Sequence, residues 1–259
     1  MANSGSGDSV VDRVVRVIAA FPEGGTVLEL SELAARAGLP LTTAHRLVRQ
    51  LAGHGLLELG SGGTVGLGLR LWELVNRNSP TLALRQAAMP FMEDIQQVLN
   101  QNVNLAVLEG WEALFVERLS RRGSVSNRAQ IAGRMPVHMS SAGLALMANQ
   151  SPAVQAEYLR QVSGPAGQQG PDGIRALLEE TAGHGFAQLA GVVDPDTWGI
   201  AVPVRDARGR TVAALGVVVP LREMRLQALV PALRTAARGI GRQLPATPNT
   251  AGFHSTEGV

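Results

Sequence analysis

The segment that most constrains the fold is residues 42–53, in which apolar side chains recur at i, i+3, i+4 and i+7: Ala44, Leu47, Val48 and Leu51. Side chains at this spacing lie on one face of a helix, so the segment predicts an amphipathic helix with one buried stripe. A shorter helix is expected before it, over residues 31–37, with Ser31 as its N-cap and Gly38 just past its end. Two short helices joined by a glycine-containing turn are typical of a helix-turn-helix.

Patterns on either side of these helices complete a small domain. Apolar residues at helical spacing predict a helix from residue 10 to Phe21, with Ser9 as its cap. Residues 56–59 and 64–67 are expected to form two short strands, because a run of glycine and serine joins them. A hairpin directly after a helix-turn-helix is a wing. We therefore predict a mostly helical winged helix-turn-helix domain over residues 9–78, preceded by a flexible tail, residues 1–8.

The polar side of the helix over residues 42–53 carries six side chains, which we call the reading face: Thr42, Thr43, His45, Arg46, Arg49 and Gln50. Between Arg36 and Leu57 the chain has three arginines and no acidic residue. The major groove of DNA admits a helix, and guanidinium, amide and hydroxyl groups match the base edges and phosphates there. The reading face therefore predicts binding to double-stranded DNA. A merely solvated helix face, or a winged helix that contacts protein or RNA, is the alternative.

Composition excludes several classes of protein. All 23 basic residues are arginine and cysteine is absent, which excludes a phosphate-loop NTPase, a Schiff-base enzyme and a thiolate metal site. The net charge is only +2. The sequence pI of 10.2 reflects the near absence of groups that titrate between neutrality and the pKa of arginine, so it does not support nucleic-acid binding.

The remaining motifs predict neither an enzyme nor a metal or cofactor site. His138 lies near Ser140, but no G-x-S-x-G elbow surrounds them. The five histidines are scattered without metal-ligand spacing. No apolar run approaches the ~18 residues that span a bilayer, and residues 1–9 lack the features of a signal peptide. We expect no membrane partner and a cytoplasmic location.

The second part of the chain mixes strand and helix patterns. Residues 79–102 are expected to be helical, with Pro90 kinking the helix or dividing it into a linker helix, residues 79–95, and a first helix of the next domain. Strands are expected at 103–108, 113–119, 186–191, 198–204 and 212–219, and helices at 141–149, 152–162, 171–184 and 221–244. This mixture predicts an α+β domain with an antiparallel sheet over residues 96–245, followed by a flexible tail, residues 246–259.

A family resemblance runs over nearly the whole chain. The chain resembles the IclR family of transcriptional regulators in the order and spacing of four strings: SELAARAGLPLTTAHRLVRQLAGHGLLE with the glycine-rich wing after it, NLAVLEG, RMPVHMSSAGLALMA and GIAVPVRDARGRTVAALGVVVP. The resemblance implies a GAF-like second domain that binds a small-molecule effector, commonly a carboxylate or an aromatic acid. It also implies a homodimer or tetramer that holds operator DNA, and it implies no catalysis.

The resemblance also implies which residues meet the effector. These are the backbone N–H groups around Ser140, Ser141, Ala142 and Gly143, and residues near Leu189, Trp198, Gly199, Leu215 and Gly216. N–H groups that open a helix favour an anion, which agrees with the first group.

Three positions depart from the family pattern in the expected effector region. Leu189 stands where relatives with small polar effectors tend to have an acid, and Gly199 and Gly216 stand where cysteine or serine is common. We therefore expect a roomier, less polar pocket and an effector bulkier than a two-carbon or three-carbon acid, such as an aromatic acid or a related amide. Strand packing alone is the alternative explanation for the glycines. Leu41 replaces a polar or basic residue before the reading helix, so one phosphate contact is expected to be lost.

These expectations combine into a ligand-responsive regulator that represses a nearby catabolic operon until its effector binds. An activator is the alternative of the same class. A metabolite-binding protein that uses its winged helix for protein contacts is the alternative of another class. Because one reading helix spans only a few base pairs, at least a dimer is expected.

Overall fold

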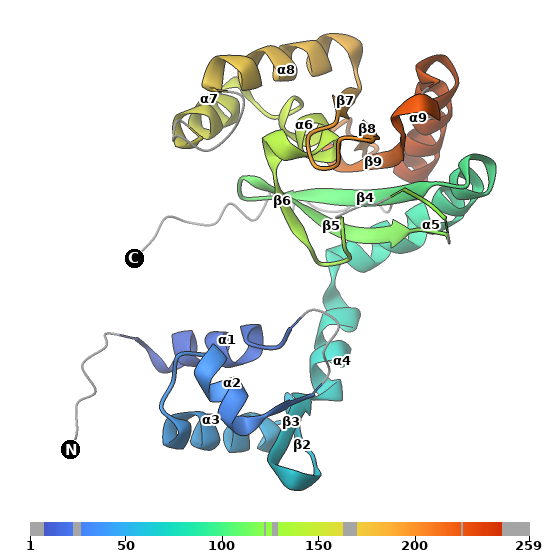
Figure 1. Cartoon of the computed structure of the whole chain (residues 1–259). Coiled ribbons are helices and arrows are strands. Elements are labelled where there is room, and N and C mark those ends of the chain that lie inside the picture. Colours follow the sequence, from blue (N-terminus) through green and yellow to red (C-terminus); the bar gives the residue numbers. More distant parts are fainter. Residues whose placement is uncertain are drawn as a thin grey trace. The chain divides into compact units, whose positions relative to one another are not determined.

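The computed structural model describes residues 8–22, 27–121, 123–125, 129–162, 170–223 and 225–244. The chain divides into two compact units, Met1–Ser79 and Pro80–Val259, and each is described by itself (Figure 1). None of the helices within the described ranges is long and apolar enough to cross a membrane.

The described residues of the first unit form helices α1 to α4 and a three-stranded antiparallel sheet of order β1-β3-β2. Val17, Leu33, Leu47 and Val48 meet the strands in one apolar core. The elements are α1 (Val10–Ala19), β1 (Val27–Glu29), α2 (Leu30–Arg36), α3 (Leu41–Gly53), β2 (Leu57–Leu59), η1 (Ser61–Gly63), β3 (Thr64–Leu67) and α4 (Leu69–Asn78).

Local sequence explains the ends of the first helices. The Ser9 side chain accepts the backbone N–H of Asp12, and the Asp12 carboxylate accepts the N–H of Ser9, so a capping box begins α1. These hydrogen bonds hold the pKa of Asp12 below its ordinary value. Gly38, between α2 and α3, has a φ of +62°, which a residue with a Cβ adopts at a cost.

Three features of the first unit differ from the expectation. The predicted cap Ser31 lies inside α2, because β1 leads directly into a helix that begins at Leu30. The reading helix α3 begins at Leu41, one residue early. Strand β1 and helix α4 were not predicted from the sequence.

The second unit is built on a six-stranded antiparallel sheet of order β6-β5-β4-β9-β8-β7. The strands are β4 (Asn102–Glu109), β5 (Glu112–Leu119), β6 (Arg134–Pro136), β7 (Ala187–Ala190), β8 (Thr197–Arg205) and β9 (Thr211–Pro220). The helices are α5 (Pro80–Leu99), α6 (Ser141–Met147), α7 (Pro152–Gln161), α8 (Pro171–His184) and α9 (Leu226–Gln243), with short turns η2 (Val137–Met139) and η3 (Leu221–Glu223).

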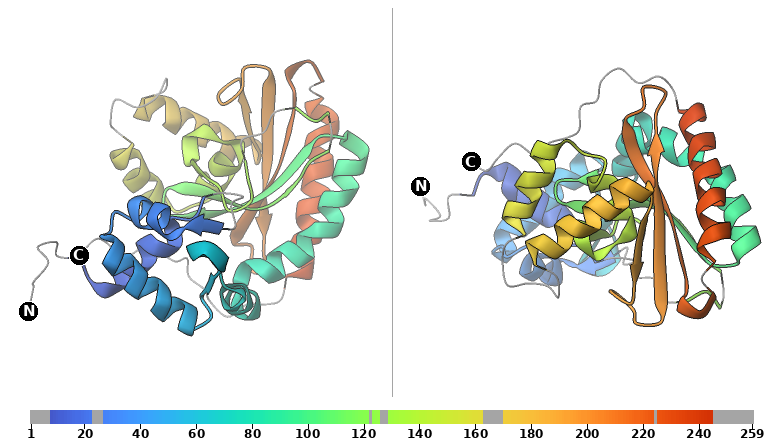
Figure 2. Two further views of the ribbon diagram at one scale, coloured as in Figure 1. Left: turned by 60° about the horizontal axis from the view of Figure 1, so that its bottom comes forward. Right: turned by 90° about the horizontal axis from the view of Figure 1, so that it is seen from above.

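Helices cover both faces of this sheet. Figure 2 shows α5 and α9 on one side of the strands and α6, α7 and α8 on the other. Alternate residues of each central strand belong to different cores, because successive side chains of a strand point to opposite faces. Leu215 and Val217 pack toward α5 and α9, whereas Ala214 packs toward α6. The predicted α+β fold with an antiparallel sheet is confirmed.

Helix α5 is one uninterrupted helix with Pro90 inside it, so the expected division does not occur. Its apolar residues, among them Ala88 and Met92, lie in the core of the second unit. The segment 79–95, expected to be a linker helix, therefore packs within this unit. The short edge strand β6 was not predicted, and α9 begins at Leu226 rather than at residue 221.

Candidate functional site

The reading face lies on the outside of α3. Thr42, His45, Arg46, Arg49 and Gln50 are exposed and Thr43 is half-buried, while the apolar stripe on the other side of the helix is buried. The small residues Ala34 of α2 and Ala44 of α3 are both buried. The helix-turn-helix packing therefore presents the predicted side chains together on one surface.

The positive charge of this surface comes from two arginines. Among the ion pairs of the described residues, none involves Arg46 or Arg49. Arg36, in contrast, donates from Nε and Nη2 to Oε1 of Glu32 at 3.0 and 2.7 Å. The local charge of +3 expected from sequence is thus reduced by one pair, which leaves two unpaired guanidinium groups on α3.

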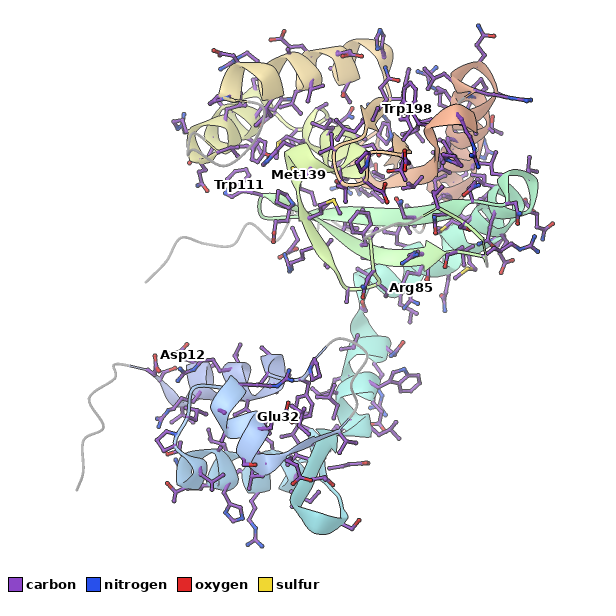
Figure 3. The ribbon with its side chains drawn as sticks, viewed as in Figure 1. Asp12, Glu32, Arg85, Trp111, Met139 and Trp198 are labelled. Atoms are coloured by element: carbon purple, nitrogen blue, oxygen red, sulfur yellow. The ribbon has the colours of Figure 1, made fainter. Side chains whose placement is uncertain are left out.

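The second unit holds a pocket on the side of the sheet that α6 covers. Its cavity volume is about 60 Å³, and the pocket is partly open to solvent. All six strands and the start of α6 contribute to its wall. The lining residues are Asn104, Phe115, Ala129, Met135, Met139, Ser140, Ser141, Ala142, Leu189, Gly191, Val192, Val193, Asp194, Thr197, Gly199 and Val218. Met139 is labelled in Figure 3.

Most of this lining is apolar, and its polar groups differ in how they are bonded. The Thr197 hydroxyl donates to the carbonyl oxygen of Asp194 at 2.9 Å. The Ser140 hydroxyl caps α6 by accepting the N–H of Gly143 at 2.9 Å. Asn104 is 4% exposed, and its Oδ1 has no hydrogen-bond partner among the described residues.

Five of the nine residues expected to meet an effector line the pocket: Ser140, Ser141, Ala142, Leu189 and Gly199. Gly199 pairs with Leu189 across the β7–β8 ladder. A Cβ on Gly199 would lie 2.9 Å from the Ser141 hydroxyl oxygen. The absence of a side chain at Gly199 therefore lets Ser141 of α6 lie close to β8 at the edge of the pocket.

Gly143 has a packing role instead of the expected role as an effector donor. Its N–H is already bonded to the Ser140 cap. A Cβ at this position would collide with the backbone carbonyl oxygen of Val137 and lie 2.6 Å from its Cα. Glycine is needed here so that α6 can approach η2 closely.

Trp198 and Leu215 do not belong to the pocket. Both pack in the core between the sheet and helices α5 and α9, because each lies one residue away from a pocket-facing position on its strand. Trp198 is labelled in Figure 3. Gly216 is on the pocket side of its strand but does not line the pocket. The Asn104 side chain lies close above it, because a Cβ on Gly216 would be 2.7 Å from Oδ1 of Asn104.

The sequence reasoning missed several lining residues. Asn104, Phe115, Met139 and Val218 come from three strands and a turn, and the loop 191–194 forms one side of the pocket. An isolated asparagine at a buried position of a strand is the one signal that was available in the sequence for Asn104.

A hydrogen-bonded pair of buried Tyr158 and half-buried His138 supports the segment before α6. The Tyr158 hydroxyl of α7 accepts the backbone N–H of His138 at 3.1 Å and lies 2.8 Å from His138 Nδ1. Burial raises the pKa of Tyr158 to about 12 and lowers the pKa of His138. A neutral imidazole whose Nδ1 accepts a hydrogen bond from the Tyr158 hydroxyl fits these contacts.

Comparisons with known proteins agree with both units. A family model for the IclR helix-turn-helix domain matches residues 10–60, and one for the bacterial transcriptional regulator IclR C-terminal domain matches residues 79–242. The HTH-type transcriptional regulator XynR of Escherichia coli is 25% identical over 210 residues, which are 79% of this chain and 83% of that protein. The transcriptional repressor IclR of E. coli is 27% identical over 142 residues, 54% of this chain and 52% of that protein.

A solved structure is similar over the whole fold. An IclR homolog from Microbacterium hydrocarbonoxydans, crystallised with 4-hydroxybenzoate, is 43% identical, with a TM-score of 0.84 over 92% of this chain and 100% of that chain. The second unit matches its family model almost from end to end, and the first carries the DNA-binding motif. The chain therefore belongs to the IclR family of bacterial transcriptional regulators, which bind DNA and are not enzymes.

Proposed function

We propose that α3 reads operator DNA through Thr42, Thr43, His45, Arg46, Arg49 and Gln50. The observation that carries this proposal is the pair of exposed guanidinium groups of Arg46 and Arg49, neither of which is neutralised by an acid among the described residues. Each can donate two parallel hydrogen bonds to a guanine edge or contact a phosphate. Because a protein that binds operator DNA must reach the chromosome, we also propose a cytoplasmic location.

Fluorescence anisotropy on the DNA upstream of the protein's own gene tests this proposal. Arg46→Ala and Arg49→Ala are each expected to weaken binding about tenfold. Loss of a phosphate contact makes the fall of log affinity with log salt less steep, by about 0.9 in the slope. Arg175→Ala is the matched control, because it removes the same charge from the exposed surface of α8. Equal effects of all three substitutions would reject the reading face.

The effector we propose for the pocket is a small aromatic carboxylic acid or a related amide. Its apolar wall supports this, since Phe115, Met135, Met139 and Val218 offer contacts to a ring rather than to a two-carbon acid. The 43% identical relative was crystallised with 4-hydroxybenzoate, which supports the same class. Calorimetry with 4-hydroxybenzoate, glyoxylate and pyruvate tests it: binding of the short acids without the aromatic acid would reject it.

The regulation we propose is repression of a nearby catabolic operon, relieved when the effector binds. The similarity to a protein named a transcriptional repressor supports this sign. An activator of the same class predicts the opposite result in one assay. A promoter–reporter fusion should rise in expression when the gene is deleted if the protein represses, and should fall if it activates.

We also propose that the protein acts as a homodimer or a tetramer. Two helices of the first unit expose apolar side chains, including Val11 of α1 at 68% and Trp72 of α4 at 63%. Such side chains are candidates for burial between subunits, and two copies are needed to read two half-sites. Light scattering on the free protein and on its DNA complex should give at least twice the chain mass, and a monomer in both would reject the proposal.

A further inference from the structure

The pocket contains one buried polar group that the protein itself leaves unused. Asn104, on β4, is 4% exposed and lines the pocket, and its Oδ1 has no hydrogen-bond partner among the described residues. A buried carbonyl oxygen without a donor is costly, so nearly all such groups in folded proteins find a partner. An orphan acceptor in the wall of a ligand pocket indicates that the ligand brings the donor.

The neighbouring strand accommodates Asn104 in this position. Asn104 pairs with Gly216 in the β4–β9 ladder. A Cβ on Gly216 would lie 2.7 Å from Oδ1 and would push the side chain away. The glycine that the sequence suggested as a source of room in the pocket thus makes room for the asparagine.

A second buried asparagine two residues earlier shows the contrast. Asn102 is 0% exposed, and its Nδ2 donates to the carbonyl oxygen of Val125 at 2.7 Å. Its Oδ1 accepts a hydrogen bond from Nη2 of Arg118 at 3.4 Å. Asn102 has partners within the protein at both ends of its amide, whereas Asn104 does not have one at Oδ1.

We propose that Asn104 determines which aromatic acids the pocket accepts, by taking a hydrogen bond from a hydroxyl group on the ring. This inference rests on the proposed function, in which the pocket binds an aromatic acid. An amide offers an acceptor at Oδ1 and donors at Nδ2, so it matches a hydroxyl, which both donates and accepts. Ring substituents without a donor, such as hydrogen or fluorine, leave Oδ1 unpaired.

Calorimetric titration of the full chain with three acids tests the inference: 4-hydroxybenzoate, benzoate and 4-fluorobenzoate. The wild type should bind 4-hydroxybenzoate about tenfold or more tightly than the other two. Asn104→Leu, which keeps the approximate size of the side chain, should reduce this ratio to about one. Asn102→Leu is the matched control and should keep the ratio.

A second measurement needs no ligand. Asn104→Leu should leave the melting temperature of the free protein unchanged or raised, because no hydrogen bond to Oδ1 is lost. Asn102→Leu should lower it, because both its hydrogen bonds are lost.

Three outcomes would overturn the role of Asn104, and a fourth would also reject the proposed effector class. The first is an affinity ratio that Asn104→Leu leaves unchanged, and the second is a wild type that binds the three acids equally. The third is a melting temperature that falls as far in Asn104→Leu as in Asn102→Leu. If none of the three acids binds the wild type, the proposed effector class fails as well.

Discussion

Replacing Arg85 with leucine tests how the second unit holds its first helix. Arg85, on α5 and labelled in Figure 3, donates to Oε2 of Glu117 from Nε at 2.9 Å and from Nη2 at 2.7 Å. Glu117, on β5, is only 3% exposed, and its other oxygen accepts the backbone N–H of Arg118 at 2.9 Å. Arg85→Leu leaves a buried carboxylate without its cation. We expect the free energy of unfolding to fall by about 3 kcal/mol, at the low end for a broken buried pair, because the Arg85 side chain is 39% exposed.

Differential scanning calorimetry of the full chain measures this loss as a melting temperature lower by roughly 6–12 °C for a unit of this size. Glu117→Leu removes the buried charge itself and should cost only about 1 kcal/mol, and the double variant should resemble Glu117→Leu rather than the sum of both. Arg134→Leu is the control, since its pair with Glu112 is 3.6 Å long and exposed, and it should cost less than about 1 kcal/mol. Equal losses from Arg85→Leu and Arg134→Leu, or strictly additive single changes, would refute the reasoning.

Three further predictions follow from the described contacts. Ser9→Ala removes the side-chain acceptor of the α1 capping box and should destabilise the first unit by about 1 kcal/mol, so an unchanged thermal transition of that unit would contradict the cap. Gly143→Ala should cost about 1–3 kcal/mol in thermal unfolding and weaken ligand binding, because the new Cβ meets the backbone of Val137; a stable variant with normal affinity would count against this close approach. Burial lowers the pKa of His138 below 6.5, so its contribution to stability is complete above about pH 6.5 and is lost as pH falls toward the lower folded value. His138→Gln cannot titrate, so the melting temperature of the wild type should fall relative to that of the variant as the pH is lowered from about 7.5 to 5.5. A relative rise would mean that the pKa of His138, at its contact with Tyr158, is raised and not lowered.

The first unit was largely predictable because its signals are local. The stripe that ends at Leu51 defines α3 by spacing alone, and Gly38 marks the turn before it. Strand β1 has only three residues and exists by pairing with β3, in which Leu28 lies opposite Val65. No periodicity over three residues could indicate this strand, so the sheet order was not accessible from sequence.

The pocket was only partly predictable because it depends on strand register. Neighbouring residues of one strand point to opposite faces, and the apolar pattern located the strands without telling which face meets α6. Gly199 and Trp198 are adjacent, yet one lines the pocket and the other packs toward α9. Asn104 was overlooked because its importance appears only when its Oδ1 is found buried and without a partner.

In the mechanism we propose, α3 holds operator DNA and an aromatic acid bound in the second unit changes the affinity for that DNA. A footprint on the DNA between the protein's gene and its upstream neighbour tests both parts of this mechanism. Without ligand, the wild type should protect two half-sites about 10 base pairs or a multiple apart, and the variant Arg46→Ala/Arg49→Ala should protect neither. Addition of 4-hydroxybenzoate should change the protection by the wild type. The same footprint from wild type and variant, or a wild-type footprint that no aromatic acid alters, would contradict the account.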